Sequence, residues 1–80
     1  MSRVFARDRV IQKFGKKLRT LRLQQKLTLQ ELAHELGYVA HGYISEIESG
    51  KKKPTADFVL KVADFFDVTT DKLLRDELRL

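Results

Sequence analysis

The side chains best suited to chemistry lie in a short segment near the middle of the chain. Large or apolar residues recur there at the spacing of one helix face, at Ala40, Tyr43, Ile44 and Ile47. The opposite face then carries small or polar residues, which are His41, Gly42, Ser45, Glu46 and Ser49. This pattern predicts a helix over residues 40–49 that buries one side and presents hydrogen-bond donors and acceptors on the other.

Catalysis is a poor explanation of this polar face. His41 and Ser45 are one helical turn apart, but no acid to orient the histidine, no glycine-rich loop and no second domain accompany them. The chain has two histidines, His34 and His41, and no cysteine, which makes an unconvincing set of metal ligands. We therefore predict that the chain is not an enzyme and that it binds no metal ion or other cofactor.

Positive charge flanks the polar helix and points to a polyanionic partner. The net charge is +5, and residues 1–26 carry nine Lys or Arg against one Asp. Residues 27–50 carry four Glu and no Lys or Arg, and Lys51, Lys52 and Lys53 follow directly. This distribution favours phosphate contacts from the amino-terminal region, including Arg3 and Arg7, and from the lysine loop. The polar helix between them is then left to inspect base edges.

A second helix with clear end signals precedes the polar one. Its apolar residues share one face, at Leu29, Leu32, Ala33 and Leu36. Thr28 and Glu31 have the spacing of a capping box at its start. Gly37 follows the last apolar residue, where a left-handed residue lets the chain leave the helix and turn. The order helix, tight turn, helix is therefore predicted from local signals alone.

The rest of the chain predicts three further helices and a basic arm. Residues 1–8 are expected to form the arm, and residues 9–80 a single domain, because a chain of 80 residues buries one core at best. The first expected helix runs from about Arg9 to Gln25, and the next is capped by Thr55 and runs to about Phe66. Thr69 or Thr70 opens a short last helix that carries Leu73, Leu74 and Leu78. Gly15 is tolerated inside the first of these. The predicted fold class is all-α, with five helices and a short basic N-terminal arm.

The composition also indicates in which part of the cell the protein is found. The absence of cysteine excludes a small secreted fold stapled by disulfides. Purely apolar runs such as residues 58–60 are far shorter than the roughly 20 residues needed to cross a bilayer. Residues 1–10 contain arginines and no apolar core, unlike a signal peptide. We expect a cytoplasmic protein that has no contact with a membrane.

The order and spacing of four segments resemble the helix-turn-helix family of phage Cro and repressor proteins, also called the xenobiotic-response-element family. The segments lie between Phe14 and Leu74 and read F-G-K-K-L-R-T-L-R, E-L-A-H-E-L-G, Y-I-S-E-I-E-S-G and K-K-K-P-T. The resemblance implies a five-helix, lambda-repressor-like domain that binds duplex DNA, usually as a two-fold homodimer and most often as a repressor. The chain departs from the family pattern at Leu29, where Gln is usual, and by one extra residue between Gly37 and Ile44.

The resemblance also implies roles for single residues. Base contacts fall on His41, Gly42 and Glu46, with Tyr43 and Ser45 beside them. A carboxylate at Glu46 would accept a hydrogen bond from cytosine N4; the alternative is an ordinary solvated helix residue. Phosphate contacts fall on Thr28, Gln30, Ser49, Lys51, Lys52 and Lys53, where Gln30 could take the place of the missing Gln. The alternative for the lysines is an exposed, solubilising loop.

Two further expectations concern structure and partners. The family pattern places a buried ion pair between Arg22 and Glu48, although Arg22 could instead contact phosphate. Leu78 and Leu80 exceed the needs of a small core and are candidates for a homodimer interface. The function that the resemblance implies is a sequence-specific transcriptional regulator. The alternative is an antitoxin, whose partner would be a toxin protein, or a restriction-modification controller with the same fold.

Overall fold

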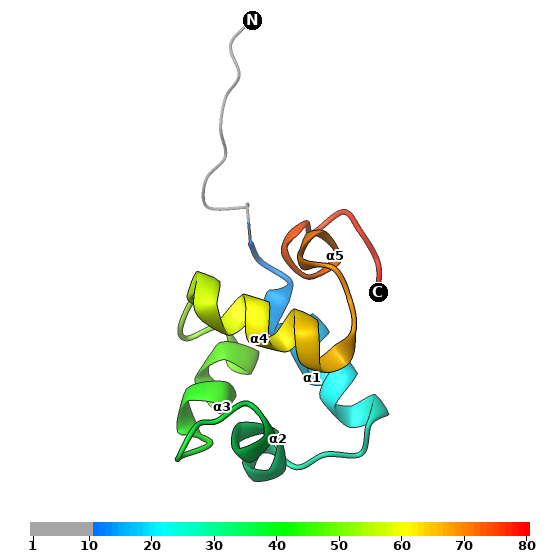
Figure 1. The fold of residues 1–80 in the computed structure, drawn as a ribbon. Helices are drawn as coiled ribbons and strands as arrows, with labels where there is room; N and C mark the ends of the chain where they lie inside the picture. The colour runs from blue at the N-terminus through cyan, green and yellow to red at the C-terminus, as the bar shows by residue number, and fades with distance from the viewer. Residues whose placement is uncertain (1–10) are drawn as a thin grey trace, which may run out of the picture.

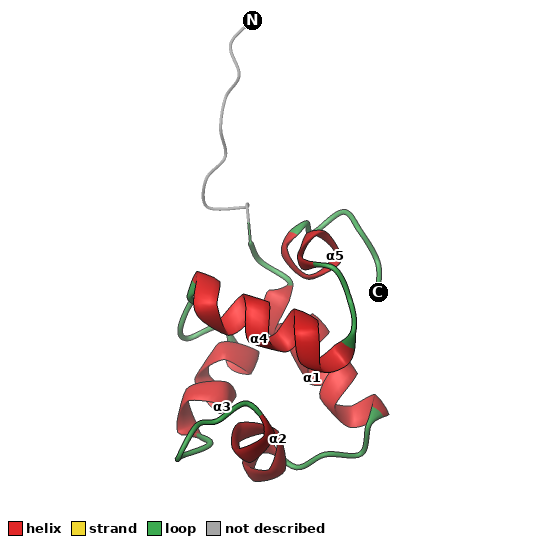
Figure 2. Ribbon diagram, viewed as in Figure 1, coloured by secondary structure: helices red, strands yellow, loops and turns green. Residues whose placement is uncertain are grey.

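The computed structural model describes residues 11–80, which form five α-helices and no β-strand. The helices are α1 (Phe14–Gln24), α2 (Leu29–Glu35), α3 (Gly42–Ser49), α4 (Ala56–Phe66) and α5 (Thr70–Leu74). Figure 1 follows them along the chain, and Figure 2 separates helix from loop. This confirms the predicted all-α, five-helix class. The expected basic arm, with Arg3 and Arg7, lies outside the described residues.

One hydrophobic core is shared by all five helices. The apolar stripe of α1 enters it through Phe14, Leu18 and Leu21, and the Phe14 ring meets the Phe58 ring of α4 edge-on with 6.2 Å between centroids. The other buried apolar residues are Leu32, Ala33, Leu36, Ile44, Ile47, Val59, Val62, Ala63 and Leu73. In Figure 1, α4 crosses in front of α1, with α2 and α3 below them and α5 above. The helical periodicity of the sequence therefore predicts most of this core.

Threonines and glycines mark helix ends where the sequence predicts them. Thr28 accepts a hydrogen bond from the Glu31 N–H at 3.0 Å, and Glu31 accepts one from the Thr28 N–H at 2.8 Å. Thr55 and Thr69 cap α4 and α5 by accepting a backbone N–H through their side-chain oxygens, without the reciprocal hydrogen bond of a capping box. Gly37 and Gly50 follow α2 and α3 with φ of +85°, a conformation that other residues adopt only at a cost. Local signals therefore account for these boundaries.

The start of α1 differs from the prediction. The helix begins at Phe14 and not near Arg9, because residues 11–13 form bends. The amide groups just before the helix are bound from a distant part of the chain: the Asp76 carboxylate accepts hydrogen bonds from the N–H groups of Gln12 and Lys13 at 3.0 and 2.9 Å. A carboxylate at a helix start satisfies unpaired N–H groups and the helix dipole. Only the tertiary structure brings this carboxylate to the start of α1.

The start of α3 also lies later than predicted. The helix begins at Gly42 with His41 as its N-cap, so Ala40 is an exposed turn residue and not part of the buried face. The physical reason is that Tyr38 turns inward, and its ring stacks on Tyr43 with centroids 5.4 Å apart. Residues 39–41, which follow Tyr38, are therefore exposed, and α3 begins only after them. The connection between α2 and α3 thus runs from residue 36 to residue 41.

The carboxyl-terminal helix is shorter than predicted. It ends at Leu74, so Leu78 lies in the segment beyond it. A lysine from α1 binds this end: buried Lys17 donates hydrogen bonds from Nζ to the carbonyl oxygens of Lys72 and Arg75 at 2.5 and 2.7 Å. A cation suits the negative end of a helix, where carbonyl groups lack partners within the helix. One lysine of a face that the sequence marks as basic is therefore structural.

Candidate nucleic-acid interface

Helix α3 is held by its apolar side and turns its polar side outward. Ile44 and Ile47 are buried in the core. The polar or small residues on the other side are exposed or partly exposed, namely His41, Gly42, Ser45, Glu46 and Ser49. The sequence therefore predicts the two faces of α3 correctly, except at Ala40. A partner outside the domain can reach the hydrogen-bonding groups on this side.

Gly15 lets α1 and α3 pass each other closely. A Cβ atom at this position would lie 2.4 Å from the carbonyl oxygen of Ile47 and 2.7 Å from that of Glu48. Both atoms belong to the backbone, so neither can turn aside as a flexible side chain would. Sequence reasoning treated Gly15 as merely tolerated; the structure shows that it is needed for the contact that positions α3. The only local signal was a glycine placed inside a helix in spite of its cost.

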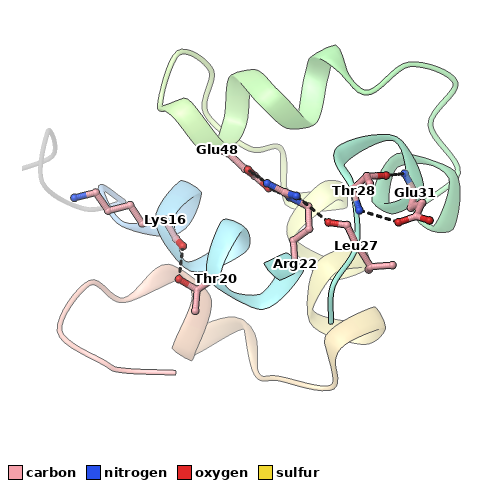
Figure 3. A network of polar contacts seen from close by, with 7 residues as sticks. All are labelled: Lys16, Thr20, Arg22, Leu27, Thr28, Glu31 and Glu48. Carbon is pink, nitrogen blue, oxygen red and sulfur yellow. Dashed lines mark hydrogen bonds and ion pairs between the residues drawn. The ribbon is translucent and has the colours of Figure 1, made fainter. Parts of the chain in front are cut away.

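A buried ion pair fastens the carboxyl-terminal end of α3 to α1. Arg22 Nε lies 2.8 Å from Glu48 Oε2, and Arg22 Nη2 lies 3.1 Å from Glu48 Oε1, which makes the pair bidentate. The third guanidinium nitrogen donates to the carbonyl oxygen of Leu27 at 2.8 Å. Figure 3 shows Arg22 reaching between these two acceptors, with the Thr28 and Glu31 capping box nearby. All three nitrogens are engaged inside the domain and the side chain is only 10% exposed, which favours the structural role of Arg22 over a phosphate contact.

The predicted base-contact residues differ in what they can offer. His41 is exposed and makes no capping hydrogen bond, and Gly42 beside it is exposed with open space where a Cβ would lie. Ser45 is partly exposed one turn later. The Tyr43 ring packs inward, because it stacks on Tyr38 and meets the Phe58 ring edge-on at 5.2 Å. Less of the Tyr43 side chain is therefore available to a partner than the exposed residues beside it offer.

Glu46 and the lysine loop are linked in the free protein. Lys52 Nζ lies 3.3 Å from Glu46 Oε1 and 5.8 Å from the centre of the Tyr43 ring. Lys51 and Lys53 are exposed, and no ion pair involves either of them within residues 11–80. The three adjacent lysines, which look alike in the sequence, therefore have different surroundings.

The start of α2 has fewer free hydrogen-bond donors for a phosphate than the sequence suggests. The N–H of Thr28 already binds Glu31, and the Glu31 carboxylate adds a negative charge there. Thr28 could then reach a phosphate only through its hydroxyl hydrogen, while Gln30 is exposed. Ser49 is exposed as well, and its hydroxyl donates to the Glu46 carbonyl oxygen at 3.1 Å. Of the two predicted phosphate sites, the lysine loop therefore has more positive charge and fewer groups already engaged.

We also searched the described part of the chain for metal sites, membrane-spanning helices and clefts. Residues 11–80 contain no group of three or more His, Asp or Glu side chains that could hold a metal ion. Their helices include none long and apolar enough to pass through a bilayer. An open cleft of about 240 Å³ lies between Gln12 and Lys53, beside the lysine loop. What these residues do offer is an exposed polar helix with a basic loop next to it.

Known proteins share both sequence and fold with this chain. Two regulators from Bacillus subtilis strain 168, YqaE and YobD, both named uncharacterized HTH-type transcriptional regulators, are similar in sequence. YqaE is 33% identical over 64 residues, or 80% of this chain and 54% of YqaE. YobD is 36% identical over 61 residues, or 76% of this chain and 54% of YobD. The chain thus spans about half the length of these relatives.

Solved structures extend the similarity to the arrangement of the helices. The N-terminal DNA-binding domain of SinR from Bacillus subtilis has a TM-score of 0.73 and 30% identity, and the match covers 81% of this chain and 94% of that one. The restriction-modification controller protein C.AhdI from Aeromonas hydrophila has a TM-score of 0.69 and 31% identity, covering 78% and 92%. SinR solved in complex with DNA has a TM-score of 0.68 and 31% identity, covering 75% and 95%. A helix-turn-helix family model matches residues 18–73. In agreement with the resemblance in its sequence motifs, the chain belongs to the helix-turn-helix family.

Proposed function

We propose that this chain is a sequence-specific transcriptional regulator that binds double-stranded DNA, with α3 in the major groove. The observation that carries the proposal is the outward polar side of α3, held in place by the core and by the Arg22–Glu48 pair, with a lysine loop beside it. A groove about 12 Å wide admits a helix, and short polar side chains can then reach base edges. The names of the relatives and the SinR complex with DNA support this function. We propose further that it acts as a repressor, by occupying promoter DNA.

The proposed contacts separate into bases and backbone. His41, Gly42, Ser45 and Glu46 face the bases, with the partly buried Tyr43 beside them. Phosphates lie against the lysine loop and Ser49, with a weaker contact at the start of α2 from Thr28 and Gln30. Arg3 and Arg7, outside the described residues, add charge from the amino-terminal side. Base contacts would give preference for one sequence, whereas phosphate contacts would add affinity for every duplex.

Selection from a pool of random duplexes tests the proposed function. The full chain should enrich one family of sequences, and its affinity for them should fall steeply as salt rises, because lysine contacts release counterions. The enriched duplexes should bind at least about a thousandfold more tightly than random competitor at moderate salt. A chain that binds all duplexes alike at moderate salt, or none, is not a sequence-specific regulator.

Gly42 provides a test of close approach that folding should not disturb. Nothing in the protein lies within 4 Å of a Cβ at this position, so Gly42→Ala should leave the free energy of unfolding unchanged or raise it by up to about 1 kcal/mol. The added methyl would stand between the start of α3 and the DNA, and we expect affinity for the selected duplex to fall about tenfold. Urea denaturation and a binding titration measure the two effects. Unchanged affinity would place the backbone of α3 away from the bases.

Dimerisation remains a proposal that rests on exposed leucines. Leu78 and Leu80 have exposed fractions of 37% and 41% and lie in the last segment of the chain. If they form the homodimer interface, Leu78→Asp should shift the protein from dimer to monomer in sedimentation, because an interface core does not tolerate an unpaired charge. Leu23→Asp is a matched control, since Leu23 is also exposed, at 53%, and lies on α1. A Leu78→Asp variant as dimeric as its parent would exclude this interface.

A second candidate function is control of a restriction-modification system. The similarity to C.AhdI, a restriction-modification controller protein, favours it. The DNA-binding surface would be the same, so the discriminating observation is the genes beside this one. A neighbouring methyltransferase and nuclease would support the controller, whereas a neighbouring toxin gene would support the antitoxin.

A further inference from the structure

We infer that Lys52 acts as a positioning residue for Glu46 and sets base preference, whereas the phosphate attraction of the lysine loop comes from Lys51 and Lys53. This inference deepens the proposed function and rests on it. It separates three adjacent lysines that the sequence and the family pattern treat alike. The separation follows from the contacts of the loop with α3.

The backbone of the loop is fastened to the same residue that Lys52 contacts. The carbonyl oxygen of Glu46 accepts hydrogen bonds from the N–H of Lys51 at 2.9 Å, the N–H of Lys52 at 3.2 Å and the hydroxyl of Ser49 at 3.1 Å. Gly50, with φ of +85°, reverses the chain so that these donors face back toward α3. The Lys52 side chain therefore starts from a defined position next to Glu46.

The Lys52 ammonium group lies near two groups on α3 that attract a cation, the Glu46 carboxylate and the Tyr43 ring. Its Nζ is 3.3 Å from Glu46 Oε1 and 5.8 Å from the centre of the Tyr43 ring, a distance at which a cation is still attracted to an aromatic face. The Tyr43 ring is itself held by Tyr38 and Phe58. The Glu46 side chain stays 45% exposed. A partner can therefore still reach a carboxylate that Lys52 orients.

Charge explains why a glutamate facing DNA would need this lysine. A lone carboxylate that enters the groove approaches two rows of phosphates and is repelled by both. Paired with Lys52, Glu46 enters as part of a neutral unit and can still accept a hydrogen bond from a base amino group such as cytosine N4. The pair is exposed in the free protein and contributes little to folding there. Inside a groove that excludes water the same attraction is stronger, so its effect should appear in base preference and not in stability.

Lys51 and Lys53 lack such a partner in the part of the chain that the structure describes. Each has a full positive charge available for a phosphate oxygen. A lysine that contacts phosphate contributes about 0.9 to the slope of log affinity against log salt, whatever the base sequence. Lys51→Met and Lys53→Met are therefore matched controls for Lys52→Met: the same substitution in adjacent residues, with a different expected result.

The experiment measures affinity of the full chain for its selected duplex, for every single base-pair change in that duplex, and at several salt concentrations. Lys51→Met and Lys53→Met should weaken binding to all duplexes by a similar factor and lower the salt slope by about 0.9 each. Lys52→Met should reduce preference at one base pair, the pair at which Glu46→Ala also loses preference, by about tenfold. Lys52→Arg, which keeps the charge, should retain that preference. In the Glu46→Ala background, Lys52→Met should change no base preference.

The possible failures are distinguishable. A parent chain that selects no duplex overturns the proposed function and this inference with it. A parent chain that selects a duplex, combined with a Lys52→Met variant that weakens all duplexes alike as Lys51→Met does, overturns the inference alone and returns Lys52 to the phosphate contacts. Loss of preference at a base pair that Glu46→Ala leaves unaffected would also overturn it.

Discussion

Arg22→Met should lower the free energy of unfolding by about 3–5 kcal/mol, because it leaves the Glu48 carboxylate buried without its partner. The side chains of the pair are 10% and 8% exposed, so water cannot readily replace the guanidinium. The carbonyl oxygen of Leu27 would lose its donor in the same step. A small domain is stable by only about 5–15 kcal/mol, so much of the population could unfold. Urea denaturation followed by circular dichroism measures the change.

Arg75 and a double variant control this prediction. Arg75 pairs with Asp71 at 3.7 Å, but the two side chains are 61% and 72% exposed, so Arg75→Met should cost at most about 1 kcal/mol. Replacing Arg22 and Glu48 together by Met should recover part of the loss, since no buried charge is then left unpaired. If Arg22→Met were no more harmful than Arg75→Met, the pair would contribute nothing special to folding.

Gly15→Ala should destabilise the protein by about 3 kcal/mol, although alanine is the better helix former. The added Cβ would lie 2.4 Å from the Ile47 carbonyl oxygen and 2.7 Å from that of Glu48, well inside van der Waals contact. Since both obstacles are backbone atoms, α1 and α3 must move apart. Separation would also strain the Arg22–Glu48 pair and shift the polar side of α3. We expect affinity for the selected duplex to fall together with stability.

Gly42→Ala is the matched control, because it makes the same substitution in a helix where a Cβ meets nothing within 4 Å. Urea denaturation of the two variants side by side should give opposite signs: a lower free energy of unfolding for Gly15→Ala and an unchanged or higher one for Gly42→Ala. A Gly15→Ala variant as stable as the parent would mean that the two helices do not cross as closely as the structure shows.

The function could not be predicted from the chemistry of single residues and required the resemblance to a known family. The apolar and polar faces of α3 followed from spacing, but their interpretation as a DNA-reading helix rested on the ordered motifs from Phe14 to Leu74. The comparisons support the same family over residues 18–73. Which polar side chains reach bases could not be derived, since that depends on where α3 begins. The start at Gly42 places His41 at the N-cap and Ala40 in the turn.

The number and order of the five helices, the capping threonines and the left-handed glycines were determined by the sequence itself, because each depends on residues within a few positions of one another. The starts of α1 and α3 and the end of α5 were not. Tertiary structure alone decided which basic residues are free: Lys17 is buried at the end of α5, Lys52 lies beside Glu46, and Lys51 remains exposed. It also decided that Gly15 is required. These outcomes depend on distances between helices, which no local pattern contains, and the packing of all five helices sets those distances together.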